Sequence, residues 1–420
     1  MSKYNKIQIV GWEVYTGPTQ YKPSRVGKVS KFVDYTGFRN IKKDRRLDVE
    51  SQCMDIEARV AFTKRAIEIA YDNVQAKEDV LKIFIAPEFL YRGASGAYLH
   101  DLLNGWEKEA PRKYGLSSKF NKQWKGLFGK LQEIVSDSKY KNWMFVFGTA
   151  ISAAFKTKII EGKCVINVDS PVDVYNTSLI TLGGGLPNSS RVVSKHLISN
   201  IDFLDYRLAT DCYSNRSIVS PDPSVIIPKN ATGNIEREPI FNFETVRRNN
   251  DEIIQFGMEI CLDHCGYKYY KNSKGFLQNK MTGRLKDNNL EVDIQIVPSA
   301  GMSLMGNSLA LKETKDKLNR FAVNCDGLSY YNISKKRNER GSHIQLIKKQ
   351  GMDINIEIDH GTNFQSIPDN AYKVDERVDI DDKFTINALN LWCCREAYEF
   401  NESNYPYGSG YVCVFDEYNL

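Results

Sequence analysis

Residues 81–88, LKIFIAPE, place a run of apolar and β-branched residues directly before a proline and a glutamate. Such a run predicts a buried strand that ends at Pro87, because proline has no backbone N–H with which to continue strand pairing. The residues before it follow a different period, since apolar side chains recur at helical spacing from Ile56 to Val74. That spacing predicts an amphipathic helix. A helix that leads directly into a buried strand is typical of α/β proteins.

The same alternation continues along the chain. Further helices are predicted from Phe120 to Ile134 and from about Leu309 to Val323. The glycine run 183–185 is expected to form a hairpin turn, because it lacks the pattern of a phosphate-binding loop. With no linker and no repeat in the sequence, we expect one α/β domain over residues 1–420. Other strands are predicted at residues 7–12, 143–148, 175–181, 253–258, 292–298, 328–334, 343–347, 354–358 and 411–415.

Composition excludes several classes of protein. The 420 residues are 42% hydrophobic and 26% charged, which is ordinary for a globular chain. A net charge of +5 is too small for a nucleic-acid-binding surface, and no stretch approaches the roughly 20 apolar residues that cross a bilayer. The first residues lack the features of a secretory signal, and the cysteines show no disulfide spacing. We therefore expect a cytoplasmic protein that binds neither nucleic acid nor membrane.

Three side chains that suit acyl transfer, those of Glu88, Lys195 and Cys261, each follow a predicted strand. A cysteine becomes a strong nucleophile when a carboxylate takes its proton and a lysine stabilises the thiolate. Lys195 and a backbone N–H after Cys261 could then stabilise the oxyanion, while Glu88 transfers protons to the leaving amine and from water. Each residue alone is more typical of core or surface. Together they predict thiol-dependent cleavage of an amide-type bond.

Two other interpretations of the same region start from the neighbouring residues. Cys261, His264 and Cys265 are close enough in sequence to suggest a metal site, but structural zinc needs four ligands and no second cluster has the usual spacing. We therefore expect neither metal nor cofactor. Alternatively, His264, His343 or His360 could act as the base of a cysteine–histidine enzyme.

Short segments around the three side chains resemble the signatures of the nitrilase (carbon-nitrogen hydrolase) superfamily. The resemblance implies a four-layer α-β-β-α sandwich in one domain with long insertions, and Glu88, Lys195 and Cys261 as its catalytic triad. It covers about residues 6 to 360, so residues 361–420 would be a C-terminal extension used for oligomerisation or packing. The matching segments are residues 85–89, 193–197 and 257–263, supported by residues 175–178, 297–300 and 320–324, the last of which resembles a helix of the family.

The resemblance also implies a substrate class. Enzymes of the superfamily cleave nitriles, amides or carbamoyl groups through a thioester, and residues 261–263, CLD, are more similar to the amidase and carbamoylase branches. We therefore expect a small-molecule amide or carbamoyl substrate, with a protein side-chain amide as a further option. The family also implies a homodimer or higher homo-oligomer, and the strand at 411–415 could pair with a neighbouring chain.

Several further residues are predicted to bind substrate or to support the triad. Many relatives hold the lysine with a second glutamate, and Asp202 is the candidate carboxylate for that position here. The proline-rich stretch 206–239 predicts a long irregular loop, which is either an active-site lid or a surface insertion. The other predicted residues are Tyr91, Asp263, His264 and Ser299.

Two other functions are compatible with these residues. The chain could be a binding or regulatory protein that keeps the fold without activity, although three costly polar groups in one pocket argue against this. It could instead pass the acyl group to an amine, as N-acyltransferases of the superfamily do. The absence of a predicted membrane span argues against the lipoprotein-modifying form of that activity.

Overall fold

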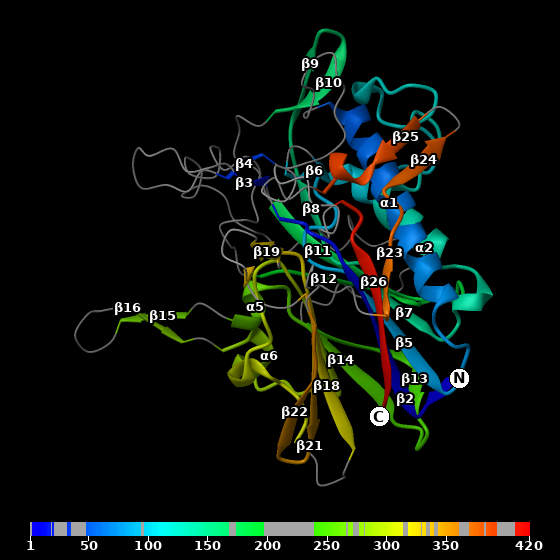
Figure 1. Ribbon diagram of the computed structural model, residues 1–420. Helices are drawn as coiled ribbons and strands as arrows, with labels where there is room; N and C mark the ends of the chain where they lie inside the picture. Colours follow the sequence, from blue (N-terminus) through cyan, green and yellow to red (C-terminus); the bar gives the residue numbers. More distant parts are fainter. Residues whose placement is uncertain are drawn as a thin grey trace.

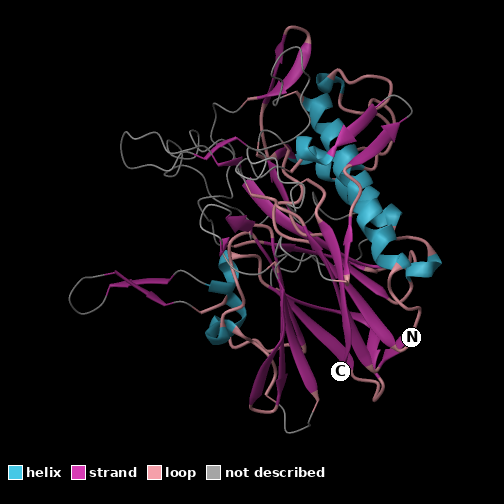
Figure 2. Ribbon diagram, viewed as in Figure 1, coloured by secondary structure: helices cyan, strands magenta, loops and turns pink. Residues whose placement is uncertain are grey.

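Two large β-sheets pack face to face in this protein, and helices cover the outer face of one of them (Figures 1 and 2). The structure is a computed structural model. It describes residues 2–17, 19–20, 32–34, 48–93, 96–167, 174–196, 239–265, 268–271, 277–280, 282–313, 318–328, 330–332, 337–339, 343–360, 369–381, 384–392 and 408–420.

The first sheet has nine strands, in the order β23-β26-β2-β5-β7-β11-β8-β6, with β12 paired to β11. Strands β2, β5 and β7 are parallel, so their C-terminal ends share one edge of the sheet. The strands are β2 (Lys6–Glu13), β5 (Val80–Ile85), β6 (Tyr98–Leu99), β7 (Trp143–Val146), β8 (Ala150–Ala153), β11 (Val174–Leu182), β12 (Ser190–Ser194), β23 (Ala371–Lys373) and β26 (Tyr411–Asn419).

The second sheet has seven strands, in the order β1-β13-β14-β17-β18-β21-β22. Its central strands β14, β17 and β18 are parallel. The strands are β1 (Ser2–Tyr4), β13 (Ile240–Arg248), β14 (Ile253–Met258), β17 (Ile294–Ser299), β18 (Asn319–Asp326), β21 (Ile344–Gln350) and β22 (Asp353–His360).

Short hairpins and helical turns lie outside the two sheets. The paired strands are β3 (Thr19–Gln20) with β4 (Phe32–Asp34), β9 (Thr157–Ile160) with β10 (Lys163–Ile166), β15 (Lys268–Lys271) with β16 (Leu277–Lys280), β19 (Tyr330–Asn332) with β20 (Arg337–Glu339), and β24 (Arg377–Asp381) with β25 (Phe384–Asn387). The 3₁₀ turns are η1 (His100–Leu103), η2 (Arg112–Tyr114), η3 (Ser138–Tyr140), η4 (Gly306–Ser308) and η5 (Ala388–Asn390).

Apolar side chains from both sheets fill the layer between them. Ile83 of β5 and Met144 of β7 belong to the same fully buried cluster as Ile294 of β17 and Val323 of β18. Burial of one such side chain stabilises the folded state by about 1.5–3 kcal/mol, so this layer joins the sheets into one unit. The strands that carry Glu88 and Cys261 therefore face a common interior.

The helical layers on the two outer faces differ. On the first sheet, α1 (Val49–Asp72) begins at Asp48, whose side chain accepts a hydrogen bond from the Ser51 N–H, and it packs beside α2 (Gly126–Ile134). On the opposite side of the molecule, the helices in the described part of the chain are α5 (Leu262–Cys265) and α6 (Arg284–Asp287), each of four residues (Figure 1). The predicted α/β class is confirmed, whereas a full fourth layer of helices is not.

The predicted helix at 309–323 is wrong, because residues 319–326 form β18, an interior strand of the second sheet. This correction includes the segment 320–324, which resembles a helix of the family. A strand that is buried on both faces has a nearly continuous apolar pattern, which a short window does not separate from a buried helix. The helix predicted from Phe120 is also shorter than expected, since α2 begins at Gly126.

Most predicted strands are present, and the chain turns back from β11 to β12 after the glycine run 183–185, as the hairpin prediction requires. The C-terminal strand takes an interior place in the first sheet, because β26 pairs with β2 on one side and with β23 on the other. Both edges of β26 are thus paired with strands of the same chain. Homo-oligomerisation stays a prediction. Among the described residues, no helix has the length and apolar character needed to cross a bilayer.

Candidate active site

Glu88 and Lys195 form a buried ion pair at the C-terminal edge of the first sheet. Glu88 lies just beyond β5, and Lys195 follows β12 directly. The Lys195 Nζ lies 2.8 Å from the Glu88 Oε1, and both side chains are fully buried. Asn176 of β11 donates its Nδ2 hydrogen to the same oxygen at 2.8 Å, and its backbone oxygen accepts the Lys195 N–H at 2.9 Å. The pair is therefore held through both side chain and backbone, as buried charges require.

The turn that carries Glu88 is fixed on several sides. The Thr16 hydroxyl donates to the Glu88 carbonyl oxygen, and the Glu88 N–H donates to the carbonyl oxygen of Ser299 at 3.3 Å. Phe89 has a φ of 65°, a left-handed conformation that is rare for an aromatic residue, and its N–H donates to the Thr149 Oγ1 at 2.9 Å. Strain of this kind persists where the surroundings impose it, and here it turns the chain back after the carboxylate.

Cys261 lies at a strained turn between β14 and α5. Its φ is 48°, also in the left-handed region, and its N–H donates to the Pro298 carbonyl oxygen at 3.0 Å. The side chain is 5% exposed, and its sulfur forms no disulfide with another described cysteine. A strained strand-to-helix turn is one way in which hydrolases present a nucleophile. The turn at Cys261 thus has a backbone conformation in which a nucleophile can be presented.

Two sets of contacts join the turns that carry Glu88, Lys195 and Cys261. Pro298 and Ser299 are adjacent at the end of β17, and their carbonyl oxygens accept the N–H groups of Cys261 and Glu88, respectively. The Asp263 carboxylate accepts the N–H of His196, the residue after Lys195, at 3.0 and 3.1 Å. Segments far apart in the sequence are therefore joined at one place.

Tyr91 and Ser299 support the structure around the site. The Tyr91 hydroxyl lies 2.8 Å from the Thr63 Oγ1 in α1, and burial raises the pKa of this hydroxyl. The Ser299 hydroxyl donates to the Asp326 Oδ2 at 2.8 Å, and the same carboxylate oxygen accepts the Gly301 N–H at 2.6 Å. Of the two predicted roles, substrate contact or support, these bonds favour support.

His264 belongs to a second buried polar group, which also contains Glu259 and Gln295. Its Nδ1 lies 2.7 Å from the Glu259 Oε2, and its Nε2 accepts the Met305 N–H at 3.0 Å. Glu259 also accepts the Leu285 N–H at 2.6 Å and the Gln295 Nε2 hydrogen at 2.7 Å. Because both ring nitrogens are engaged, His264 is available neither as a base for Cys261 nor as a metal ligand.

The other two histidines considered as bases also have different partners. The His343 Nδ1 contacts the Asp326 carbonyl oxygen at 2.7 Å, and the His360 Nδ1 contacts Glu13. Asp202 and residues 206–238 of the predicted loop lie outside the described residues.

Asn176 and Glu259 are site residues that the sequence prediction missed. Asn176 lies in the segment 175–178, which carries part of the family resemblance, and that signal could have found it. Glu259 sits two positions before Cys261 and has no sequence signal of its role, because its partners come from residues 264, 285 and 295.

Comparisons with known proteins add little to this geometry. No protein-family model matches the sequence, and no curated protein matches it either. Among solved structures, the chain is similar to the crystal structure of a carbon-nitrogen hydrolase from Helicobacter pylori G27, with 12% sequence identity and a TM-score of 0.27. The match covers 85% of this chain and 87% of that chain. At this TM-score the similarity is weak, so function has to be inferred from the site residues themselves.

Proposed function

We propose that this protein is a thiol-dependent carbon-nitrogen hydrolase of the nitrilase superfamily that cleaves an amide-type bond. The main support is the fully buried Glu88–Lys195 pair, with 2.8 Å between Nζ and Oε1, next to the turn that carries Cys261. Moving a carboxylate and an ammonium out of water costs about several kcal/mol of free energy per ion before the two ions pair. An ion pair beside a strained cysteine is therefore better explained by chemistry than by stability.

In the proposed reaction, Glu88 takes the thiol proton of Cys261, and the thiolate attacks the carbonyl carbon of the substrate. The carbon–nitrogen bond then breaks as Glu88 returns that proton to the leaving nitrogen, which departs as ammonia or an amine. Glu88 next takes a proton from water, and the resulting hydroxide attacks the thioester. The acid leaves and the thiol is restored.

Lys195 has a separate role in this proposal. Negative charge develops on the carbonyl oxygen in both tetrahedral intermediates, and a fixed cation in a buried site stabilises that charge strongly. Lys195 and the backbone N–H of Leu262 would donate hydrogen bonds to the oxyanion. Asn176 would orient Glu88, because it donates to the oxygen that also binds Lys195.

The proposed substrate is a small amide or carbamoyl compound. Support for this class comes from the sequence resemblance of residues 261–263 to the amidase and carbamoylase branches. Transfer of the acyl group to an amine would use the same thioester and differ only in the molecule that accepts the acyl group. An experiment therefore has to vary that acceptor.

The test is a panel of primary amides, N-carbamoyl compounds and nitriles, with release of ammonia as the measurement. Hydroxylamine is added in parallel, because it captures a thioester as a hydroxamate. Intact-protein mass spectrometry should show an acyl adduct on the wild type and none on Cys261→Ala. Cys265→Ala is the matched control, since Cys265 is also buried and lies four positions away in α5. Turnover or an adduct that persists in Cys261→Ala would refute the proposal.

A further inference from the structure

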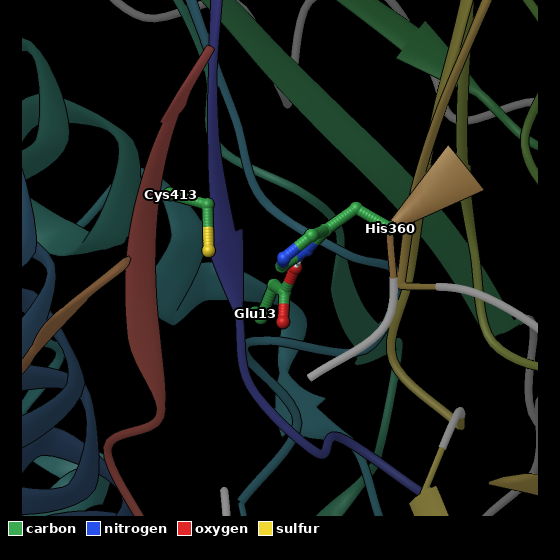
Figure 3. A group of neighbouring side chains, drawn as sticks. All are labelled: Glu13, His360 and Cys413. Atoms are coloured by element: carbon green, nitrogen blue, oxygen red, sulfur yellow. Dashed lines mark hydrogen bonds and ion pairs between the residues drawn. The ribbon is translucent and has the colours of Figure 1, made fainter. Parts of the chain in front are cut away.

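A second cluster of reactive side chains lies between the two sheets, built from Glu13, His360 and Cys413 (Figure 3). Glu13 ends β2, Cys413 lies on the neighbouring strand β26, and His360 ends β22 of the opposite sheet. One ligand atom from each residue lies within 4.8 Å of the other two. The figure shows the three side chains directed toward one another from separate strands.

The strand register explains why these residues meet. Gly11 of β2 is the partner of Cys413, and Glu13 lies two residues further on the same face. Across the layer, a Cβ on Gly11 would clash with Ile344, the partner of His360 in the second sheet. The absent side chain at Gly11 thus lets the two sheets approach closely at this level.

This cluster does not have the properties of a second nucleophilic centre. Burial raises the pKa of the Cys413 thiol, and the nearby Glu13 carboxylate raises it further. The side chains of Glu13 and Cys413 have no exposed surface, so the thiol is out of reach of a substrate. The His360 ring is bonded to Glu13, with 17% of its side chain exposed.

The donor set indicates what the cluster can bind. Calcium and magnesium prefer sites made of oxygen atoms, whereas a thiolate, an imidazole and a carboxylate together suit zinc and similar transition metals. Water could supply the fourth ligand and complete a tetrahedral set.

We propose that Glu13, His360 and Cys413 form a binding site for one zinc-type divalent ion that joins the two sheets. When the ion binds, Cys413 loses its thiol proton to solvent. His360 coordinates as the neutral ring, and the proton that it shares with Glu13 moves to the other ring nitrogen or to solvent. Affinity therefore increases with pH, since binding releases protons.

The site would also support the loop of Glu88. Thr16 lies three residues after Glu13, and its N–H donates to the Gly327 carbonyl oxygen at 2.8 Å, while its hydroxyl donates to Glu88. An ion at the end of β2 would hold this segment against the second sheet. We therefore expect a structural role, with a higher melting temperature in the loaded protein.

The experiment uses full-length protein stripped with a chelator and titrated with cobalt(II), which reports thiolate ligands through a near-ultraviolet charge-transfer band. We expect one equivalent bound per chain, displacement by zinc(II), and a rise in melting temperature with either ion. Cys413→Ala and His360→Gln should lose the band, whereas Cys265→Ala and Cys261→Ala should keep it.

The idea is overturned if stripped wild-type protein shows neither the band nor a thermal shift, or if the band persists in Cys413→Ala. The wild-type titration needs no variant, so a variant that fails to fold does not prevent a decision. No substrate is used, and retention of the band by Cys261→Ala separates this site from the proposed hydrolase activity.

Discussion

Two buried carboxylate–base pairs in this protein differ in what else each carboxylate holds. The Glu88–Lys195 pair has a separation of 2.8 Å and the Glu259–His264 pair one of 2.7 Å, with all four side chains fully buried. Glu259 also binds the backbone of α6 through Leu285, whereas Glu88 is oriented by the side chain of Asn176. The Glu259–His264 pair therefore holds chain segments together, and the Glu88–Lys195 pair presents charged groups beside a cysteine.

The two pairs lie at the ends of different strands: Glu88 and Lys195 follow β5 and β12 of the first sheet, and Glu259 follows β14 of the second. Met258 and Cys261 belong to the apolar layer between the sheets, while Glu259 faces outward to α6 and Gln295. Alternation along β14 directs Met258 toward the other sheet and Glu259 outward, and the left-handed turn at Cys261 returns that residue to the inner layer. Charge and burial alone do not distinguish a reactive pair from a structural one.

The largest expected effect is on Cys261, which only the first pair serves. Cys261→Ala should lower turnover by about 10⁴-fold or more, because a lost nucleophile removes the thioester route. Its free energy of unfolding should change by about 1 kcal/mol or less, since the replacement is small. Ammonia release and urea unfolding measure the two quantities. Turnover within tenfold of wild type would show that Cys261 is not the nucleophile. The two buried pairs would then not differ in chemical role.

Glu88→Gln should lower both turnover and stability. Loss of the general base costs about 10²–10⁴-fold in rate, and Lys195 without its counter-charge costs about 3–5 kcal/mol in the free energy of unfolding. The double variant Glu88→Gln/Lys195→Met should recover much of the stability and none of the turnover. Recovery of turnover in the double variant would contradict the proposed roles.

Glu259→Gln should lower stability and change turnover little. Hydrogen bonds to a charged group contribute about 1.5–3 kcal/mol each, so we expect a loss of roughly that size in the free energy of unfolding. Turnover should fall by less than about tenfold, which corresponds to 1.4 kcal/mol or less in the barrier. Urea unfolding and ammonia release again provide the measurements. A loss of turnover as large as for Glu88→Gln, with unchanged stability, would place Glu259 in the chemistry.

Asn176→Ala tests how far orientation of Glu88 matters. Loss of one hydrogen bond to a charged group should lower turnover by about tenfold, for a loss of roughly 1.5 kcal/mol. The KM for a small amide should stay close to the wild-type value, because Asn176 contacts Glu88 and not the proposed acyl group. A rise in KM with unchanged kcat would indicate substrate contact instead.

The smallest expected effect is a pH dependence of the free energy of unfolding that arises from His360, whose ring contacts the Glu13 carboxylate. Burial alone would lower the pKa of His360, but the hydrogen bond and charge of Glu13 raise it overall. The resulting stability is fully present below the ordinary pKa of about 6.5 and is lost as pH rises through the higher folded value. In chelator-treated protein, the stability advantage over His360→Gln should therefore shrink as pH increases. An advantage that grows with pH would contradict this assignment.

Local sequence pattern predicted much of the fold. Apolar runs such as residues 81–86 and 253–258 form strands in both sheets, and the period from Ile56 to Val74 corresponds to α1. The pattern was misleading at 309–323, where burial on both faces of β18 removed the alternation that marks a strand. A window of neighbouring residues does not report which faces of an element will be covered.

By itself, the sequence determined that Glu88, Lys195 and Cys261 each follow a strand and that their order resembles one superfamily. Only the tertiary structure decided their partners: Asn176 for Glu88, Pro298 for the Cys261 turn, and Glu259 rather than Cys261 for His264. The physical reason is that a strand's side-chain direction has a local period of two, whereas its neighbours depend on the order of strands across the sheet. Contacts between such distant segments form only when both sheets have closed on their common core.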